Sequence, residues 1–144
     1  MRKRAIDIVI SMVGLAGLVP IFVIMVVVIK LDSEGPIFFR QERMGRRFKP
    51  FRIIKFRTMI SETTNRAPAL AAVNSTRITR IGRWLRRLKI DELPQLVNVL
   101  KGDMSLVGPR PELRRYVELR RHDYEMLLTV RPGMTDPASL AYHD

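Results

Sequence analysis

Two adjacent carboxylates, Asp91 and Glu92, are the side chains best suited by type and spacing to do chemistry. They open the segment 90–102, whose apolar residues recur at the three- and four-residue spacing of a helix. Pro94 is tolerated in the first turn of a helix, and Gly102 is typical of the position just after the last turn. This pattern predicts a helix over 90–102 and makes Asp91 its natural N-cap.

The Asp91-Glu92 pair allows two interpretations. In the structural one, Asp91 caps the helix, which is worth about 1 kcal/mol, and Glu92 complements the helix dipole. In the functional one, two carboxylates beside a basic surface hold a divalent cation and present a nucleophile to a phosphate. Spacing alone leaves both interpretations open.

A further candidate for phosphate binding is Arg110, which stands between Pro109 and Pro111. Proline fixes its own φ angle and also restricts the residue before it. A guanidinium carried on such a stiff segment suits bidentate recognition of a phosphate group.

The composition of the 144 residues excludes several other chemistries. Without cysteine there is no disulfide, thiolate nucleophile or cysteine-bound metal, and the chain has no glycine-rich phosphate loop. The two histidines, His122 and His143, lack the spacing of metal ligands and are expected at the surface. Because 26 Lys and Arg face 14 Asp and Glu, the net charge of +12 calls for nucleic acid, anionic lipid or a phosphorylated small molecule.

The positive charge is concentrated in residues 40–89, where 15 basic residues accompany only two acidic ones. The segments 37–39 and 51–57 are rich in β-branched and aromatic residues and flank a stretch that contains glycine and proline. This arrangement predicts a β-hairpin. Alternation along its second strand would place Lys55 and Arg57 on one face.

Two more helices are expected in the second half of the chain. Apolar residues recur at helical spacing among the arginines of 78–88, which predicts a basic amphipathic helix of the kind that lies in a membrane interface. A solvated basic face over a soluble core is the alternative. A last helix is predicted over 112–128, before the break at 131–133, and residues 61–75 are expected to form a loop.

The strongest single signal is the run 8–29, which contains no charged residue. At about 1.5 Å per residue it is long enough to cross a hydrocarbon core of about 30 Å. Basic residues flank both ends, which disfavours a helix that passes through the membrane, and Pro20 predicts a bend near the middle. A re-entrant helix that turns at Pro20 and an ordinary kinked transmembrane helix both fit these features.

Six strings along the chain together resemble the bacterial sugar transferases, the monotopic polyprenyl-phosphate phosphoglycosyl transferases. They are KRAID at 3–7, GPIFFRQERMG at 35–45, KFRTM at 55–59, RITRIG at 77–82, DELPQL at 91–96 and KGDMSLVGPRPE at 101–112. Each string is weak alone, but together they run in the family's order along nearly the whole chain.

The resemblance implies transfer of a sugar-1-phosphate from a UDP-sugar to polyprenyl (undecaprenyl) phosphate, the step that initiates assembly of surface glycans. It makes Asp91 the nucleophile that forms an aspartyl-phosphosugar intermediate, and it makes Glu92, with Asp91, the ligand of Mg²⁺. It also makes Pro20 the break of a re-entrant helix. The basic residues expected to contact substrate phosphates are Lys55, Arg57, Arg86, Arg110 and Arg131.

The expected fold is therefore α+β and mainly helical, with a small β-hairpin and interfacial amphipathic helices. A membrane-inserted helix-break-helix anchor is expected over 1–30, and a cytoplasmic catalytic domain over 31–144. The resemblance places the enzyme on the cytoplasmic face of the bacterial inner membrane, with membrane lipid and both substrates as partners and no nucleic acid. A homodimer is left open.

The sequence departs from the family's pattern after Thr135, where members commonly continue with a different string and several dozen more residues. We therefore expect a catalytic domain that is short at its C-terminus. The alternative function is a membrane-anchored basic adaptor that binds anionic lipid or nucleic acid without catalysis. An adaptor explains the charge but not Asp91-Glu92 or Pro109-Arg110-Pro111.

Overall fold

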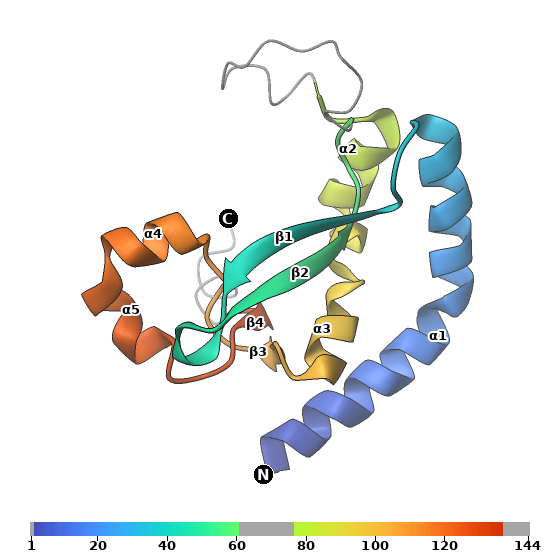
Figure 1. The fold of residues 1–144 in the computed structure, drawn as a ribbon. Helices are drawn as coiled ribbons and strands as arrows, with labels where there is room; N and C mark the ends of the chain where they lie inside the picture. Colours follow the sequence, from blue (N-terminus) through green and yellow to red (C-terminus); the bar gives the residue numbers. More distant parts are fainter. Residues whose placement is uncertain (1, 61–76, 137–144) are drawn as a thin grey trace. The chain divides into compact units, whose positions relative to one another are not determined.

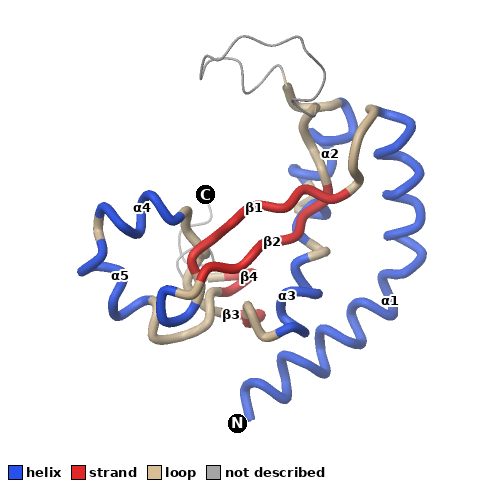
Figure 2. Tube along the Cα trace, in the orientation of Figure 1, coloured by secondary structure: helices blue, strands red, loops and turns tan. Residues whose placement is uncertain are grey.

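A computed structural model describes residues 2–60 and 77–136. The chain folds into two compact units, and each is described by itself. Unit 1 consists of Met1–Gly17, Arg40–Ile54 and Pro94–Asp144, and unit 2 consists of Leu18–Phe39 and Lys55–Leu93. The fold is mainly helical with short strands, as predicted (Figure 2). The loop expected at 61–75 lies outside the described residues.

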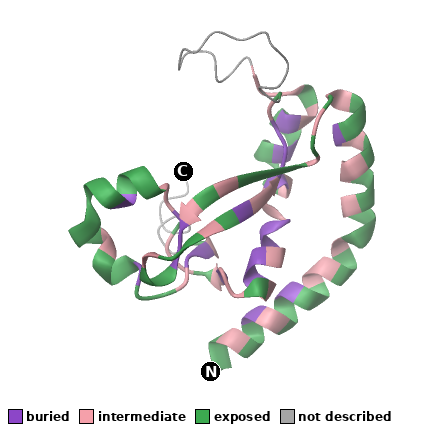
Figure 3. Cartoon of the chain, in the orientation of Figure 1, coloured by how far each residue is buried: buried purple, intermediate pink, exposed green. Residues whose placement is uncertain are grey.

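The apolar N-terminal run forms α1, Arg2–Asp32, a helix of 31 residues with a mean hydropathy of 2.9 over its most apolar window. It is long and apolar enough to cross a membrane, a test that a buried core helix or a signal sequence also passes. Most of its apolar side chains are exposed (Figure 3). The helix continues through Pro20 without interruption, so the expected break between two helices is absent from its secondary structure.

The predicted β-hairpin is present. Strand β1, Phe38–Met44, pairs with strand β2, Pro50–Phe56, and the short turn η1, Arg46–Phe48, connects them. Arg47 and Phe48 both have left-handed φ angles, of 57° and 58°. Such angles are uncommon in residues other than glycine, and nothing in the composition of the turn predicts them.

Unit 1 is built around the helix α3, Gln95–Lys101, and the parallel pair of strands β3, Ser105–Val107, and β4, Gly133–Thr135 (Figure 1). Ile53, Val99 and Met104 form one buried cluster of this unit, and Met44, Val117 and Leu128 form another. Two short helices, α4 (Arg114–Leu119) and α5 (Arg121–Leu127), complete it.

The single helix predicted over 112–128 is wrong. Arg120, with φ −127° and ψ 42°, separates α4 from α5. The break escapes the sequence pattern because Val117 and Leu128, one on each side of it, still pack into the same buried cluster with Tyr124.

Unit 2 holds the predicted basic amphipathic helix as α2, Arg80–Arg87. Thr79 caps it, because its side chain accepts a hydrogen bond from the backbone N–H of Gly82. The buried side of α2 contributes Leu85 to a cluster with Ile29 and Phe56.

The N-cap role predicted for Asp91 is also wrong. Lys89 has a left-handed φ of 54°, which redirects the chain after α2 into a separate 3₁₀ turn, η3, Ile90–Glu92. The helix α3 begins only at Gln95, with Pro94 at its N-cap. Its predicted end is confirmed, since Gly102 closes it with a φ of 91°.

Candidate active site

Asp91, the predicted nucleophile, lies in η3 with a buried side chain. Burial raises the pKa of its carboxyl, because removal of water disfavours the charged form. The positive charge of Lys55 opposes this rise, the neighbouring Glu92 adds to it, and Arg86 also lowers the pKa. Asp91 is thus a desolvated carboxyl set among one other carboxylate and two basic side chains.

Glu92 is held by Lys55. The Lys55 ammonium lies 2.5 Å from Oε1 of Glu92, and each side chain retains only about a fifth of its exposure, 20% and 24%. A charge-assisted hydrogen bond of this length is among the stronger side-chain contacts in proteins. The structure therefore brings together Lys55, Asp91 and Glu92, and their roles toward substrate and metal stay predictions.

Arg86 lies on α2, in the same unit as Asp91 and Glu92. Its Nε donates a hydrogen bond to the hydroxyl of Thr58 at 2.9 Å. Thr58 is buried, and its carbonyl accepts a hydrogen bond from the N–H of Thr79, the cap of α2. A methyl group added to Gly82 would stand only 2.1 Å from that carbonyl oxygen. The sequence analysis missed Thr58, although it lies in the KFRTM string.

Arg57, which is predicted to contact a substrate phosphate, hydrogen-bonds to the backbone of unit 2. It is 5% exposed, and its two terminal nitrogens donate to the carbonyls of Ser33 and Glu34 and to the Ser33 hydroxyl, over 2.6 to 2.8 Å. These contacts fasten the end of β2 to the residues that follow α1. They favour a structural role, and the role in phosphate binding stays a prediction.

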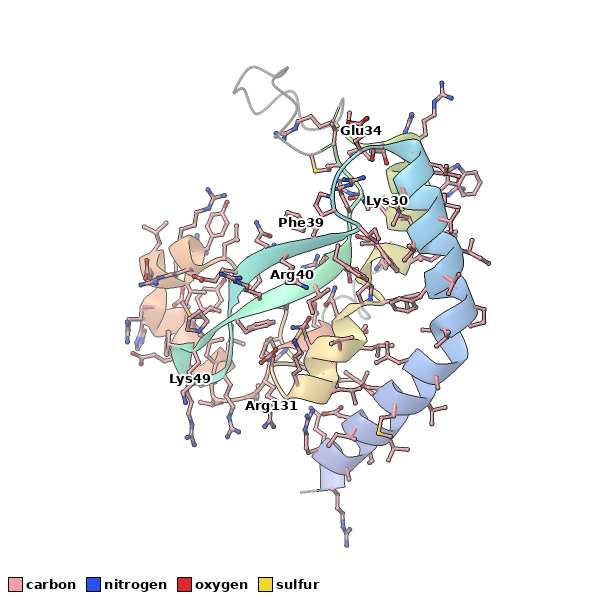
Figure 4. The ribbon with its side chains drawn as sticks, turned by 45° about the vertical axis from the view of Figure 1, so that its right-hand side comes forward. Lys30, Glu34, Phe39, Arg40, Lys49 and Arg131 are labelled. Carbon is pink, nitrogen blue, oxygen red and sulfur yellow. The ribbon has the colours of Figure 1, made fainter. Side chains whose placement is uncertain are left out.

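The two remaining predicted phosphate ligands, Arg110 and Arg131, belong to unit 1. Their segments are joined by the parallel strands, because Gly108 N–H donates to Thr135 and Gly133 N–H donates to Pro109. The Nε of Arg131 donates to the carbonyl of Gly102 at 2.8 Å, just past the end of α3 (Figure 4).

Basic side chains at the start of α1 make long-range contacts that the sequence analysis did not predict. In unit 1, Arg4 donates to the carbonyls of Val99 and Leu100 near the C-terminus of α3, over 2.6 and 2.9 Å. Lys3 donates to the carbonyl of Val107 in β3 at 2.8 Å. The one available signal was the KRAID string, which places ionisable residues at the edge of an apolar run.

Among the described residues, the candidate metal ligands are the two adjacent carboxylates, Asp91 and Glu92. Within 2–60 and 77–136, no group of three or more His, Asp or Glu side chains could enclose a metal ion. The adjacent carboxylates Asp91 and Glu92 match the way Mg²⁺ is usually held, by one or two carboxylates with the remaining ligands from water and substrate phosphates.

Comparison with known proteins identifies the family. The family model of the bacterial sugar transferases matches residues 1–144. The chain is 40% identical over 143 residues to a UDP-N-acetylgalactosamine-undecaprenyl-phosphate N-acetylgalactosaminephosphotransferase of Aeromonas hydrophila, a match that covers 97% of this chain and 34% of the relative.

Two further relatives are UDP-glucose:undecaprenyl-phosphate glucose-1-phosphate transferases. The Caulobacter vibrioides protein is 43% identical, over 97% of this chain and 54% of its own length. The Escherichia coli protein is 40% identical, over 96% of this chain and 30% of its own length. The chain thus spans less than two thirds of each of these three relatives. The match along all 144 residues shows that this chain belongs to the bacterial sugar transferase family.

Proposed function

We propose that this protein is a phosphoglycosyl transferase that moves a sugar-1-phosphate from a UDP-sugar to undecaprenyl phosphate and thereby initiates assembly of a surface glycan. The observation that carries the proposal is the buried Asp91 carboxyl beside Glu92, Lys55 and Arg86 in unit 2. The names of the relatives support the class of reaction, since they act on undecaprenyl phosphate with glucose or N-acetylgalactosamine donors.

The reaction proceeds in two displacements at the sugar-bearing phosphorus. In the first, a carboxylate oxygen of Asp91 forms a bond to that phosphorus while the bond to the bridging oxygen of the diphosphate breaks, and UMP leaves with the electron pair. In the second, a phosphate oxygen of undecaprenyl phosphate attacks the same phosphorus. The bond to Asp91 breaks, which yields undecaprenyl diphosphate sugar and regenerates the carboxylate.

Asp91 must be ionised to attack, and its surroundings bear on this in two ways. Burial strips water from the carboxylate and raises its pKa, which also leaves the charged form a better nucleophile. Lys55 and Arg86 counter the rise and favour the charged form. Their positive charges are also suited to the diphosphate of the donor, whose negative charge grows on the leaving UMP.

Glu92 and Asp91 are the residues that would hold Mg²⁺. A bound Mg²⁺ neutralises charge on the diphosphate and orients it. The oxygen-only character of the pair fits this ion. Arg110 and Arg131 of unit 1 are further candidates for contact with substrate phosphates, since both stand on segments tied together by β3 and β4.

We propose that the active site lies on the cytoplasmic face of the inner membrane, with α1 as a re-entrant helix that bends at Pro20 in the membrane while its helical structure continues. The exposed apolar side chains of α1 suit lipid contact, and basic residues stand at both ends of the apolar run. The exposed Trp84 and Leu88 beside the arginines of α2 suit an interfacial position. Such an arrangement lets a soluble donor and a lipid acceptor reach the same site.

The first experiment is an intact-mass measurement on purified protein mixed with Mg²⁺ and UDP-sugars, without a lipid acceptor. UDP-glucose and UDP-N-acetylgalactosamine head the panel because relatives use these sugars. We expect wild type to gain the mass of one phosphosugar and release UMP, and Asp91→Asn to gain nothing. An adduct of equal yield on Asp91→Asn would remove Asp91 as the nucleophile. A parallel reaction contains undecaprenyl phosphate, and absence of both the adduct in the first reaction and lipid product in the second, for every donor, would reject the proposed function.

A further inference from the structure

The Glu92 carboxylate, which is expected to bind a metal ion, already forms an ion pair with the Lys55 ammonium. The Lys55 ammonium contacts Oε1 of Glu92 at 2.5 Å, and both side chains are largely withdrawn from water. Partly buried ion pairs are screened by salt less than exposed ones, so this contact is a real competitor for any other cation. A divalent ion that binds Oε1 is repelled by the Lys55 ammonium, and this repulsion favours displacement of Lys55.

Four charged groups of unit 2, Asp91, Glu92, Lys55 and Arg86, carry formal charges that sum to zero when all are ionised. Asp91 and Glu92 contribute two negative charges when both are ionised. Lys55 and Arg86 contribute two positive charges, and these three neighbours are the charged groups that shift the pKa of Asp91. A bare divalent cation would add two positive charges beside Lys55 and Arg86, which is costly where water is scarce.

We propose that Lys55 acts as a resident counter-ion of Glu92, so that the cluster takes up a divalent cation together with a diphosphate and binds the bare cation weakly. The inference rests on the proposed function and adds to it that the metal ion binds together with the donor diphosphate and not before it. A diphosphate brings the negative charge that offsets the metal, and its oxygens give the displaced Lys55 ammonium a new anion to contact. Lys55 thereby has two partners in turn, Glu92 before the donor arrives and the diphosphate afterwards.

This exchange couples two binding events. If the diphosphate strengthens metal binding by some factor, the metal strengthens diphosphate binding by the same factor, because binding free energies are linked reciprocally. Substitution of Lys55 should abolish this exchange, because it removes the ion pair with Glu92 that exists before the diphosphate binds. Glu92 would then lose this counter-ion and would bind a bare cation more tightly.

The test uses Mn²⁺, which shares the preference of Mg²⁺ for oxygen ligands and can be counted by electron paramagnetic resonance. Free Mn²⁺ is titrated against metal-free protein, alone and with the methylene analogue of UDP, which has no bridging oxygen to act as a leaving group. For wild type we expect the analogue to tighten Mn²⁺ binding by about tenfold or more, within the usual range of coupling between sites. For Lys55→Met we expect bare Mn²⁺ to bind about tenfold more tightly and the effect of the analogue to shrink.

Two variants make the result specific to Lys55. Lys55→Arg keeps the positive charge and should keep weak binding of bare Mn²⁺, whereas Lys55→Gln should behave like Lys55→Met. Lys49→Met removes an exposed lysine of unit 1 and should leave both titrations as in wild type (Figure 4). Circular dichroism verifies that each variant is folded before titration.

Bare Mn²⁺ bound equally by wild type, Lys55→Met and Lys55→Gln would overturn the inference, as would an analogue that leaves Mn²⁺ affinity unchanged in wild type. These results are distinguishable from failure of the proposed function. The function is judged by the phosphosugar adduct, whereas the titrations involve no turnover. The expected titrations, obtained without any adduct or lipid product, would keep the counter-ion role and reject the transferase.

Discussion

The Asp7 carboxylate accepts a hydrogen bond from the Ser105 hydroxyl at 2.9 Å, and both side chains are buried in unit 1. The other carboxylate oxygen accepts from the backbone N–H of Leu106 at 3.2 Å. One turn earlier on α1, Lys3 donates to the carbonyl of Val107. Two side chains from the first two turns of α1 therefore hydrogen-bond to the three consecutive residues of β3.

Removal of the Asp7 carboxylate should strongly destabilise unit 1. Asp7→Ala leaves the Ser105 hydroxyl and the Leu106 N–H buried without their acceptor, at a cost of about 2 to 4 kcal/mol. Ser105→Ala removes only one donor and should cost about 1 kcal/mol. Thermal unfolding in detergent measures both, and the double variant should lose less than the sum of the two because the residues are partners.

The control for Asp7 is Asp123→Ala, which removes an exposed carboxylate from α5. Its effect should stay within about 0.5 kcal/mol, as is usual for surface substitutions. Equal losses for Asp7→Ala and Asp123→Ala, or strictly additive effects at Asp7 and Ser105, would contradict the contact.

Substitution of Asn98 by either alanine or aspartate should destabilise the protein. Its side-chain oxygen accepts from the Ile54 N–H at 3.0 Å, and its amide nitrogen donates to the Arg52 carbonyl at 2.8 Å and to Asp103 at 3.2 Å. Asn98→Ala leaves these partners unpaired, and Asn98→Asp replaces the donor with an acceptor that repels both. We expect each to lower the free energy of unfolding by about 2 to 4 kcal/mol in urea titrations. A stability of Asn98→Asp equal to wild type would refute the assigned donor and acceptor.

Sequence patterns predicted the elements whose signals are local. The hairpin, α2 and the end of α3 at Gly102 follow from residues that stand next to one another in the chain. The N-cap prediction for Asp91 failed because Lys89 takes a left-handed φ angle, which no property of lysine indicates. The sequence pattern assigns Asp91 to the start of the following helix because no local signal marks the turn at Lys89.

Polar contacts between residues far apart in the chain are the second kind of feature that the sequence does not predict. The KRAID string contributed to the family resemblance, but a charge at the edge of an apolar run is ordinarily a flanking residue. Asp7 acquires its partner from Ser105, 98 positions further along the chain. Likewise, Lys55 and Arg57 lie two residues apart, yet one contacts Glu92 and the other is held by carbonyls after α1. Only the fold assigns such neighbours different roles.

A methyl group at Gly82 should disturb the support of Arg86. The added Cβ would meet the Thr58 carbonyl oxygen at 2.1 Å and the carbonyl carbon at 2.8 Å, both backbone atoms that cannot swing aside. We expect Gly82→Ala to destabilise the protein by about 2 kcal/mol or more and to reduce adduct formation, because Thr58 also receives the Arg86 hydrogen bond.

Gly17→Ala is the matched control for Gly82→Ala. A Cβ at this position in α1 meets nothing within 4 Å, and alanine favours a helix by about 1 kcal/mol over glycine. Thermal unfolding should therefore show a neutral or stabilising effect at Gly17 and a clear loss at Gly82. A Gly82→Ala protein as stable as wild type would contradict the close approach of Thr58.

The re-entrant topology predicts that both ends of α1 face the cytoplasm. The chain has no cysteine, so a single introduced thiol reports one position cleanly. Arg2→Cys and Glu34→Cys stand at exposed positions before and after the apolar run. In intact cells, a membrane-impermeant maleimide should label neither, and in inverted membrane vesicles it should label both. Labelling of either thiol from outside the cell would establish a through-going helix instead.

The burial of Asp91 predicts that its replacement by asparagine stabilises the metal-free protein in a pH-dependent way. Because the folded-state pKa is raised, protonated Asp91 favours the native state at low pH, and this advantage is lost as pH rises through the folded pKa. An asparagine side chain cannot ionise, so Asp91→Asn in EDTA should match wild type near pH 3, below the unfolded pKa of about 3.8, and exceed its melting temperature by about 1 to 3 °C at pH 7. A lower melting temperature for the variant at pH 7 would mean that Lys55 and Arg86 outweigh desolvation, and that the carboxylate stabilises the fold.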